Sequence, residues 1–98
     1  MNVKRGYYDN GALRHEERYE NGKRCGVERE WDPDGTLNYE SSYENGKRHG
    51  LQRGYHANGA LACEGRYYRG DRHGVWRGFY SNGILACEER YDHGERVE

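Results

Sequence analysis

The chain has 98 residues, of which 33% are hydrophobic and 34% are charged, and its mean hydropathy is −1.41. A chain of this length makes one small domain, residues 1–98, which can bury only a modest part of its surface. The net charge of −1 comes from 16 basic and 17 acidic residues spread along the chain, so the broad positive field that binds nucleic acid is missing. Aromatic residues make up 13%, which argues against disorder and indicates a folded domain built on rings.

The sequence also bears on the compartment. The first ten residues, MNVKRGYYDN, contain no apolar run of signal-peptide length, and no later stretch has the roughly 18 apolar residues that a membrane helix needs. The 3 cysteines are an odd number, which fits a reducing compartment better than a disulfide framework. We therefore expect a cytoplasmic protein with free thiols.

The sequence repeats itself. The letters YENGKR occur at residues 19–24 and again at 43–48. Gly26, Gly50 and Gly74 are spaced by 24 residues and divide the chain into four gapless units, residues 2–25, 26–49, 50–73 and 74–97. The first half of each unit shares four columns: Val3, Val27, Leu51, Val75; Arg5, Arg29, Arg53, Arg77; Tyr7, Trp31, Tyr55, Phe79; and Gly11, Gly35, Gly59, Gly83. The second half shares five more: Leu13, Leu37, Leu61, Leu85; Glu16, Glu40, Glu64, Glu88; Tyr19, Tyr43, Tyr67, Tyr91; Gly22, Gly46, Gly70, Gly94; and Arg24, Arg48, Arg72, Arg96.

Each unit contains two turn signals separated by short stretches rich in Tyr, Val, Leu and Arg, which predicts antiparallel strands joined by hairpins. In the sequence DPDG at residues 32–35, Pro33 suits the first central position of a type I turn, and Gly35 suits the left-handed residue of a G1 bulge. We therefore expect three-residue loops at 33–35 and, by the same rule, at 44–46. The predicted fold is all-β: an elongated single antiparallel β-meander of about eight strands, built from four tandem 24-residue hairpin repeats, with almost no helix.

Loop length sets the strand register, and a shift of one residue would exchange the two faces of the sheet. Three-residue loops place Trp31 opposite Leu37 and Arg29 opposite Tyr39, all on one face. On this face the Val/Leu, aromatic, Leu and Tyr columns are expected to form the core, with the Arg29 column stacked over neighbouring rings. The column of Glu40 would point to the opposite, solvated face.

The unit has the pattern G-x-x-R-x-[YWF]-x-x-[ND]-G-x-L-x-x-E-x-x-Y-x-x-G, which closely resembles the MORN-repeat variant family over residues 2–97. The resemblance implies a sheet of hairpins that serves as a scaffold for protein contacts. Its bacterial members of antitoxin or immunity type imply a protein partner that is neutralised by binding, and the family name also implies a role at membrane surfaces. The chain departs from the pattern at Glu30, where other units have Gly, and at Arg69 and His93, where Asn is usual in the turn.

Catalytic and metal-binding signatures are weak. The sequence has no G-x-S-x-G, H-E-x-x-H or G-x-x-x-x-G-K-[ST] motif. Identical glutamates on a solvated face lack the cleft and the unequal environments that glycosidase carboxylates need. His73, Cys63 and Cys87 share a face in the expected register, but they lack the paired ligand spacing of zinc sites. We therefore expect no enzymatic activity, no metal and no cofactor.

Columns that differ between units are better candidates for a specific function. On the expected solvated face, polar residues of the first two units give way to small and aromatic residues in the last two. The candidate partner-binding residues are Trp76, Tyr80, Ile84, Ala62, Ala86, Gly78 and His56. The expected register places Trp76 across from Ala62 and Glu88, and Gly78 beside Ala86. A large ring would then stand on a floor of small residues, which is typical of an interface hot spot.

The predicted function is a non-enzymatic, protein-binding repeat scaffold that acts by steric occlusion of its partner, which the resemblance implies is a toxin or a defence enzyme. Four alternatives remain. The chain could be a membrane-surface scaffold that binds anionic lipid, which its balanced charge disfavours. It could be a regulatory subunit of an enzyme. The patch around Trp76 could instead form a homodimer, or Trp76 could simply pack flat on its own sheet. Nucleic acid is not an expected partner.

Overall fold

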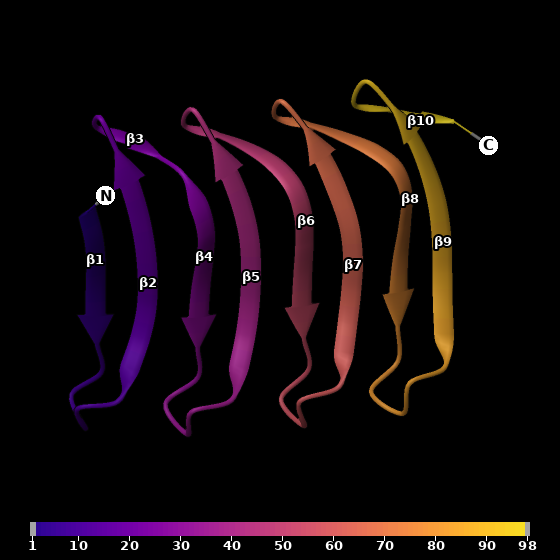
Figure 1. Ribbon diagram of the computed structural model, residues 1–98. Helices are drawn as coiled ribbons and strands as arrows, with labels where there is room; N and C mark the ends of the chain where they lie inside the picture. Colours follow the sequence, from indigo (N-terminus) through magenta and orange to yellow (C-terminus); the bar gives the residue numbers. More distant parts are fainter. Residues whose placement is uncertain (1, 98) are drawn as a thin grey trace.

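The computed structural model describes residues 2–97, which form one sheet of ten β-strands and no helix (Figure 1). The strands are β1 (Asn2–Tyr7), β2 (Leu13–Glu20), β3 (Lys23–Arg24), β4 (Gly26–Trp31), β5 (Leu37–Glu44), β6 (Lys47–Tyr55), β7 (Leu61–Tyr68), β8 (Asp71–Phe79), β9 (Leu85–Asp92) and β10 (Glu95–Val97). They pair antiparallel in the order β1-β2-β4-β5-β6-β7-β8-β9-β10, and β3 pairs with the end of β2. Met1 and Glu98, the ends of the predicted domain, lie outside the described residues.

The predicted all-β meander is confirmed. The sheet measures 43 × 36 × 13 Å, so it is one layer that extends along the direction of the repeats. Ten strands are present rather than about eight, because the chain breaks at Cys25 between β3 and β4 and because a short β10 follows β9. Within residues 2–97 there is accordingly no apolar helix of membrane-spanning length.

The loop at residues 33–35 has the predicted geometry. The Gly35 N–H donates a hydrogen bond to the Asp32 carbonyl at 2.9 Å, and the Asp32 N–H donates to the Thr36 carbonyl at 2.8 Å. Gly35 has a φ of 90°, the left-handed conformation expected after a type I turn with Pro33 at its first central position. The Asp34 carboxylate accepts a hydrogen bond from the Thr36 N–H at 2.9 Å, which further fixes the loop.

The register beyond this loop differs from the prediction. Trp31 lies opposite Leu37 as expected, but a β-bulge follows, and Arg29 then lies opposite Glu40 instead of Tyr39. The same shift occurs in four hairpins, between Gly6 and Tyr7, Glu30 and Trp31, Gly54 and Tyr55, and Gly78 and Phe79. One extra residue in the second strand turns the rest of that strand over. The predicted faces are therefore correct for the first strand of each hairpin and wrong for most of the second.

The other loop of the unit is shorter than predicted. Glu44 lies directly opposite Lys47, so the loop consists of Asn45–Gly46 alone. These two residues have φ values of 51° and 83°, as a type I′ turn requires. Arg69 and His93 hold nearly the same conformation, with φ values of 49° and 51°, although Asn is the usual residue. The departures from the repeat pattern therefore leave the turn geometry unchanged.

The bulge sorts the columns into two faces that we name by their residues. The arginine–glutamate face carries the columns of Arg29 and Glu40, and the tyrosine face carries the columns of Tyr43 and Arg48. On the first face the paired side chains are Arg5 and Glu16 (2.9 Å), Arg29 and Glu40 (3.2 Å), Arg53 and Glu64 (2.7 Å), and Arg77 and Glu88 (2.7 Å). The predicted stacking of the Arg29 column over rings is wrong, and so is the placement of the Glu40 column on the opposite face.

The expected hydrophobic core is also absent from the described residues. Within residues 2–97 no hydrophobic side chain is fully buried, and the most buried side chains belong to Ser41 and Glu16, which are 1% and 9% exposed. A single sheet has no second layer to cover either face, so the rings and aliphatic chains remain half-buried. The sheet is held by its backbone ladder and by polar and aromatic rows on both faces.

Candidate functional site

The tyrosine face alternates guanidinium groups and phenol rings across the sheet. The central guanidinium carbon lies over the neighbouring ring at 5.0 Å for Arg24 and Tyr43, 5.4 Å for Arg48 and Tyr67, and 5.3 Å for Arg72 and Tyr91. The guanidinium groups of Arg24 and Arg72 also donate hydrogen bonds to the hydroxyls of Tyr43 and Tyr91, at 3.2 and 3.1 Å. Cation–π contacts of this kind hold the side chains in a row.

The arginines of this row remain charged. Hydrogen bonding with Tyr67, and after it with Tyr91, raises the pKa of Arg72 above its ordinary value. Hydrogen bonding with Tyr43 likewise raises the pKa of Arg48. The face therefore presents fixed positive charges between its rings.

Trp76 stands on the tyrosine face and lies over Gly65. A Cβ atom placed on Gly65 would come within 2.0 Å of the indole Cδ2, so the ring occupies the space that any other residue would fill. The indole Nε1–H donates to the Arg66 carbonyl at 3.1 Å. These two contacts hold the ring against the sheet in one orientation.

Two tyrosines and an arginine surround this indole. The Tyr67 ring meets it edge to face at 5.2 Å and 84°, and the Tyr91 ring lies 6.4 Å away at 74°. The Arg72 guanidinium carbon lies over the indole at 5.0 Å. We call Trp76, Tyr67, Tyr91 and Arg72 the aromatic cluster.

The Trp76 ring lies over a small residue, as expected, but that residue is Gly65 and not the predicted Ala62. Trp76 lies opposite Glu89, and its ring covers Gly65 instead of Ala62. Gly78 lies between Cys63 and Cys87 instead of beside Ala86. On the β9 side the hairpin bulge shifts the pairing by one residue. On the β7 side the shift is three residues, because the loop at Arg69–Gly70 has only two residues and a further register shift lies between Glu64 and Arg66.

The other candidate residues lie in different places. Tyr80 and Ile84 are 58% and 60% exposed and belong to the loop between β8 and β9. His56 is half-buried, and its Nε2 is 2.8 Å from the Phe79 carbonyl, so it joins two neighbouring hairpins. The single predicted patch is thus divided, and the partner-binding role of its residues stays a prediction.

A shallow hollow of about 250 Å³ lies beside the aromatic cluster. Its lining includes Trp76, Tyr91, Gly78 and the free thiols of Cys63 and Cys87. Within residues 2–97, no three His, Cys, Asp or Glu side chains come together in a way that could hold a metal ion. The hollow is open on one face of a thin sheet, which suits contact with a partner surface more than chemistry on an enclosed substrate.

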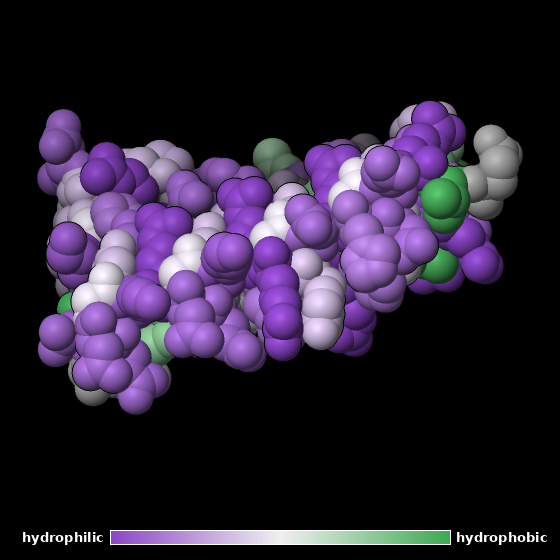
Figure 2. Space-filling model, turned by 90° about the horizontal axis from the view of Figure 1, so that it is seen from above, coloured by the Kyte–Doolittle hydropathy of each residue, from purple (hydrophilic) through white to green (hydrophobic). Residues whose placement is uncertain are grey.

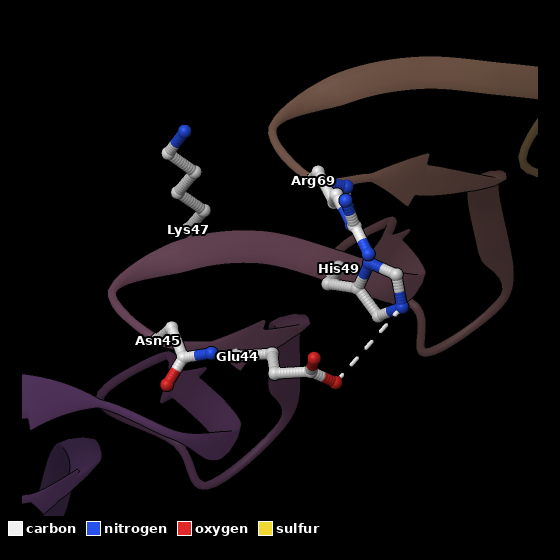
Figure 3. A pocket seen from close by; sticks show the side chains of 5 residues that line it. All are labelled: Glu44, Asn45, Lys47, His49 and Arg69. Atoms are coloured by element: carbon white, nitrogen blue, oxygen red, sulfur yellow. Dashed lines mark hydrogen bonds and ion pairs between the residues drawn. The ribbon is translucent and has the colours of Figure 1, made fainter.

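A second hollow, of about 290 Å³, lies between the two-residue turns of neighbouring hairpins (Figure 3). Glu44 and His49 form a long ion pair of 4.0 Å across it, and the His49 Nδ1 accepts a hydrogen bond from the Arg69 N–H at 3.1 Å. Viewed from this end, the surface is mostly hydrophilic (Figure 2). These contacts explain the hollow as part of the packing between turns.

Sequence reasoning missed Gly65 and the two tyrosines of the aromatic cluster. One signal was available: Gly65 is the small member of a column that otherwise holds Glu17, Ser41 and Glu89. A lone glycine inside a strand often marks a close approach of another group. No residue of the sequence marks the bulge in the same way, because the residues at its position differ between hairpins.

The comparison with known families agrees with this geometry. A family model described as MORN repeat variant matches residues 24–45, 48–68 and 72–93, which together make up more than half of the chain. The chain belongs to the MORN repeat variant family. The matched stretches begin at Arg24, Arg48 and Arg72, the arginines of the tyrosine face. No curated protein matches the chain.

Each match contains one three-residue loop with its two flanking strands. The first hairpin, β1 and β2, lies before the first match, although it has the same bulge as the others. MORN repeats commonly serve as binding or scaffold modules, and a non-enzymatic repeat scaffold is consistent with that role.

Proposed function

We propose that this chain is a non-enzymatic scaffold that binds another protein through the aromatic cluster of its tyrosine face and blocks that partner by covering its surface. The observation that carries the proposal is the cluster itself, in which two tyrosine rings and a guanidinium group converge on Trp76. Elsewhere, the sheet presents mostly charged and hydroxylated side chains. Trp, Tyr and Arg are the residues that most often dominate the energy of protein interfaces.

The cluster is already ordered before a partner arrives. The Trp76 ring lies against Gly65 and is hydrogen-bonded to the Arg66 carbonyl, so binding does not have to fix its rotamer. Preorganisation of this kind favours affinity because less conformational entropy is lost on association. The half-exposed indole offers the apolar surface, and the charge of Arg72 offers direction toward an acidic or carbonyl-rich partner.

A more specific form of the proposal rests on the resemblance of the repeat pattern to antitoxin and immunity proteins. Such proteins neutralise a partner by occupying its surface, which a sheet of this kind could do without catalytic groups. The partner would then be a toxin or a defence enzyme present in the same cytoplasm. A regulatory subunit would use the same face on an enzyme that it does not inhibit, so the activity of the captured partner separates the two roles.

The membrane-surface alternative has less support. The arginines of one face lie beside glutamates, as Arg29 and Arg53 lie beside Glu40 and Glu64, and those of the other face lie over rings. The net charge is −1, so the overall electrostatic attraction to anionic headgroups is weak. Flotation with acidic vesicles at physiological salt tests this directly, since a lipid-binding scaffold would travel with the vesicles.

The test of the main proposal is affinity capture with the tagged chain in its native cells, followed by binding measurements with the purified partner. Replacing Trp76 with Ala is expected to weaken binding about 30-fold, which corresponds to about 2 kcal/mol. Tyr68→Ala is the matched control, because Tyr68 is an exposed ring, 47% exposed, outside the aromatic cluster. Equal affinity of Trp76→Ala and wild type would contradict the assignment of the site.

A further inference from the structure

The exposed hydrophobic side chains gather at the two edges of the sheet. Within residues 2–97, seven large hydrophobic residues are exposed: Val3, Tyr7, Tyr68, Tyr80, Ile84, Leu85 and Val97. Apart from Tyr68, they lie on β1 at one edge or on β9, β10 and the adjoining loop at the other edge. The two edges are opposite ends of one repeating structure (Figure 1), so each lacks the neighbour that an inner hairpin has.

The inner junctions show what such a neighbour provides. The Tyr8 hydroxyl donates a hydrogen bond to the Trp31 carbonyl at 2.6 Å, and the Asn10 amide donates to the Pro33 carbonyl at 3.2 Å. Two hairpins later, His56 Nε2 lies 2.8 Å from the Phe79 carbonyl, and the Asn58 amide donates to the Ser81 carbonyl at 2.9 Å. In these two of the three junctions a loop reaches forward to the backbone of the next hairpin, whereas Asp32 and Asp34 of the middle junction make no such bond within residues 2–97.

The loop between β8 and β9 carries side chains that can donate the same hydrogen bonds. Tyr80 and Asn82 stand in the columns of Tyr8 and Asn10, 72 residues further along the chain. Within residues 2–97, neither the Tyr80 hydroxyl nor the Asn82 amide nitrogen donates a hydrogen bond, although the Asn82 oxygen accepts one from the Ile84 N–H. Tyr80 is 58% exposed, whereas Tyr8 is half-buried. The loop therefore points two donors beyond the edge of the sheet.

The backbone of β9 is open on the same side. In the described chain, β10 pairs with residues 90–92 of β9, which leaves residues 85–89 unpaired along the outer side of that strand. At the equivalent place in the inner sheet, Glu16 pairs with Arg29 of the next hairpin, and Glu40 pairs with Arg53. The side chain of Glu88 is 44% exposed against 11% for Glu16, as expected for a member of this column whose outer neighbour is missing.

The strand that fits this place is a second β1. β1 aligns with β4 column by column, with Val3 and Arg5 in the positions of Val27 and Arg29, and its own outer side is unpaired in the described chain. Charged residues on a strand edge usually discourage pairing. Here the charges are complementary, because the register of the inner junctions places Lys4 and Arg5 of one copy opposite Glu89 and Glu88 of the other.

We propose that two copies of this chain associate head to tail, with β1 of one copy added to β9 of the other so that the sheet continues across the contact. The Tyr80 hydroxyl then donates to the Tyr7 carbonyl of the second copy, and the Asn82 amide donates to its Asp9 carbonyl. Leu85 comes to lie near Tyr7 of the second copy, which covers exposed apolar surface on both edges. The contact uses two different surfaces, so association continues beyond a dimer.

Sedimentation velocity on the 98-residue chain over a wide range of concentration tests this. Wild type is expected to grow past the mass of a dimer as concentration rises. The double variant Tyr80→Phe with Asn82→Ala removes both donors and is expected to weaken association about tenfold. Tyr68→Phe, which removes a hydroxyl away from both edges, is expected to behave as wild type. A chain that stays monomeric, or that stops at a closed dimer, would overturn the proposal.

A charge exchange gives a second test. Glu88→Arg places like charges at the contact in one variant, and Arg5→Glu does so in another, so each alone is expected to stay monomeric. An equimolar mixture is expected to associate and to grow with the two variants in alternation, because each edge of one variant is complementary to the opposite edge of the other. Circular dichroism checks that each variant keeps its sheet, since each also loses an internal ion pair. Growth of either variant alone, or no association in the mixture, counts against the proposed register. The proposed function does not depend on association between copies, so failure of this contact would leave it standing.

Discussion

Arg24 and Arg72 occupy the same column of the repeat, yet their surroundings differ in kind. Arg24 lies 3.1 Å from the Glu17 carboxylate and 3.5 Å from that of Glu28. Arg72 has Trp76 at the position that corresponds to Glu28, and its guanidinium lies over the indole at 5.0 Å. The N-terminal region thus neutralises its arginine with carboxylates, whereas the C-terminal region covers it with rings.

This difference arises without any change in the backbone. The hairpins share the same bulge, the same loops and the same pairing, so the repeated columns build the scaffold. The columns that vary decide what the surface can bind. A neutralised charge row is well solvated and has little to gain from a partner, while rings around a charged guanidinium gain by being covered.

The largest loss of stability and of partner binding is expected when Gly65, which makes room for the Trp76 ring, is replaced. Gly65→Ala would place a Cβ about 2.0 Å from the Trp76 ring, so the ring must leave its position. We expect a loss of about 2 kcal/mol in the free energy of unfolding, measured in urea, together with loss of partner binding. Gly54→Ala is the control, since its Cβ would meet the Cys63 Sγ at 3.0 Å and a smaller loss should follow. Similar losses in the two variants would contradict the role given to Gly65.

The second prediction concerns a variant that gives the C-terminal region the carboxylate of the N-terminal region. Trp76→Glu restores the carboxylate that Arg24 has at Glu28, so the fold should persist, with the free energy of unfolding within about 1 kcal/mol of wild type. Partner binding should fall about 30-fold, as in Trp76→Ala. Thermal unfolding and binding to the captured partner measure the two effects. Retained binding would mean that the rings are not what the partner recognises.

The fold was largely predictable from the sequence, because the 24-residue period, the DPDG loop and the alternation of residue types act locally. The face of each second strand was not predictable. It depends on one extra residue just beyond the Trp31–Leu37 pair. Glycine lies across from that extra residue in three hairpins, but Glu30 stands there in the second, and the extra residue itself varies. Because of this register error, the prediction for the candidate site included Trp76 but assigned Tyr67 and Tyr91 to the opposite face.

The third prediction concerns pH. The hydrogen bond from Arg5 lowers the pKa of Glu16, and the hydroxyl of Tyr19, followed by Arg24, lowers that of Glu17. Because the folded state depresses these values below 4.5, their contribution is present above that pH and is lost as pH falls through the folded values. Glu16→Gln with Glu17→Gln should cost about 1 kcal/mol at neutral pH and progressively less in acid. Unfolding curves at several pH values measure this, and a constant cost at every pH would contradict it.

The fourth prediction, with the smallest expected effect, concerns variants that give the N-terminal region the tryptophan and glycine of the C-terminal region. Glu28→Trp alone should fail to reproduce the aromatic cluster, because Ser41 stands in the column where Gly65 makes room for the indole. Adding Ser41→Gly should let the new ring settle, and its fluorescence should shift to shorter wavelength relative to the single variant. Identical spectra for the single and double variants would show that the glycine is not needed.

The claim that supports the rest is that the pairing of β8 with β7 and β9 brings Trp76 over Gly65, between Tyr67 and Tyr91. Nuclear Overhauser contacts of the indole protons in solution measure this directly. We predict strong contacts to the Gly65 α-protons and to both tyrosine rings, with the Gly65 α-protons shifted upfield by the indole ring current. Contacts to the Ala62 methyl group in their place would match the register expected from three-residue loops and would contradict this account.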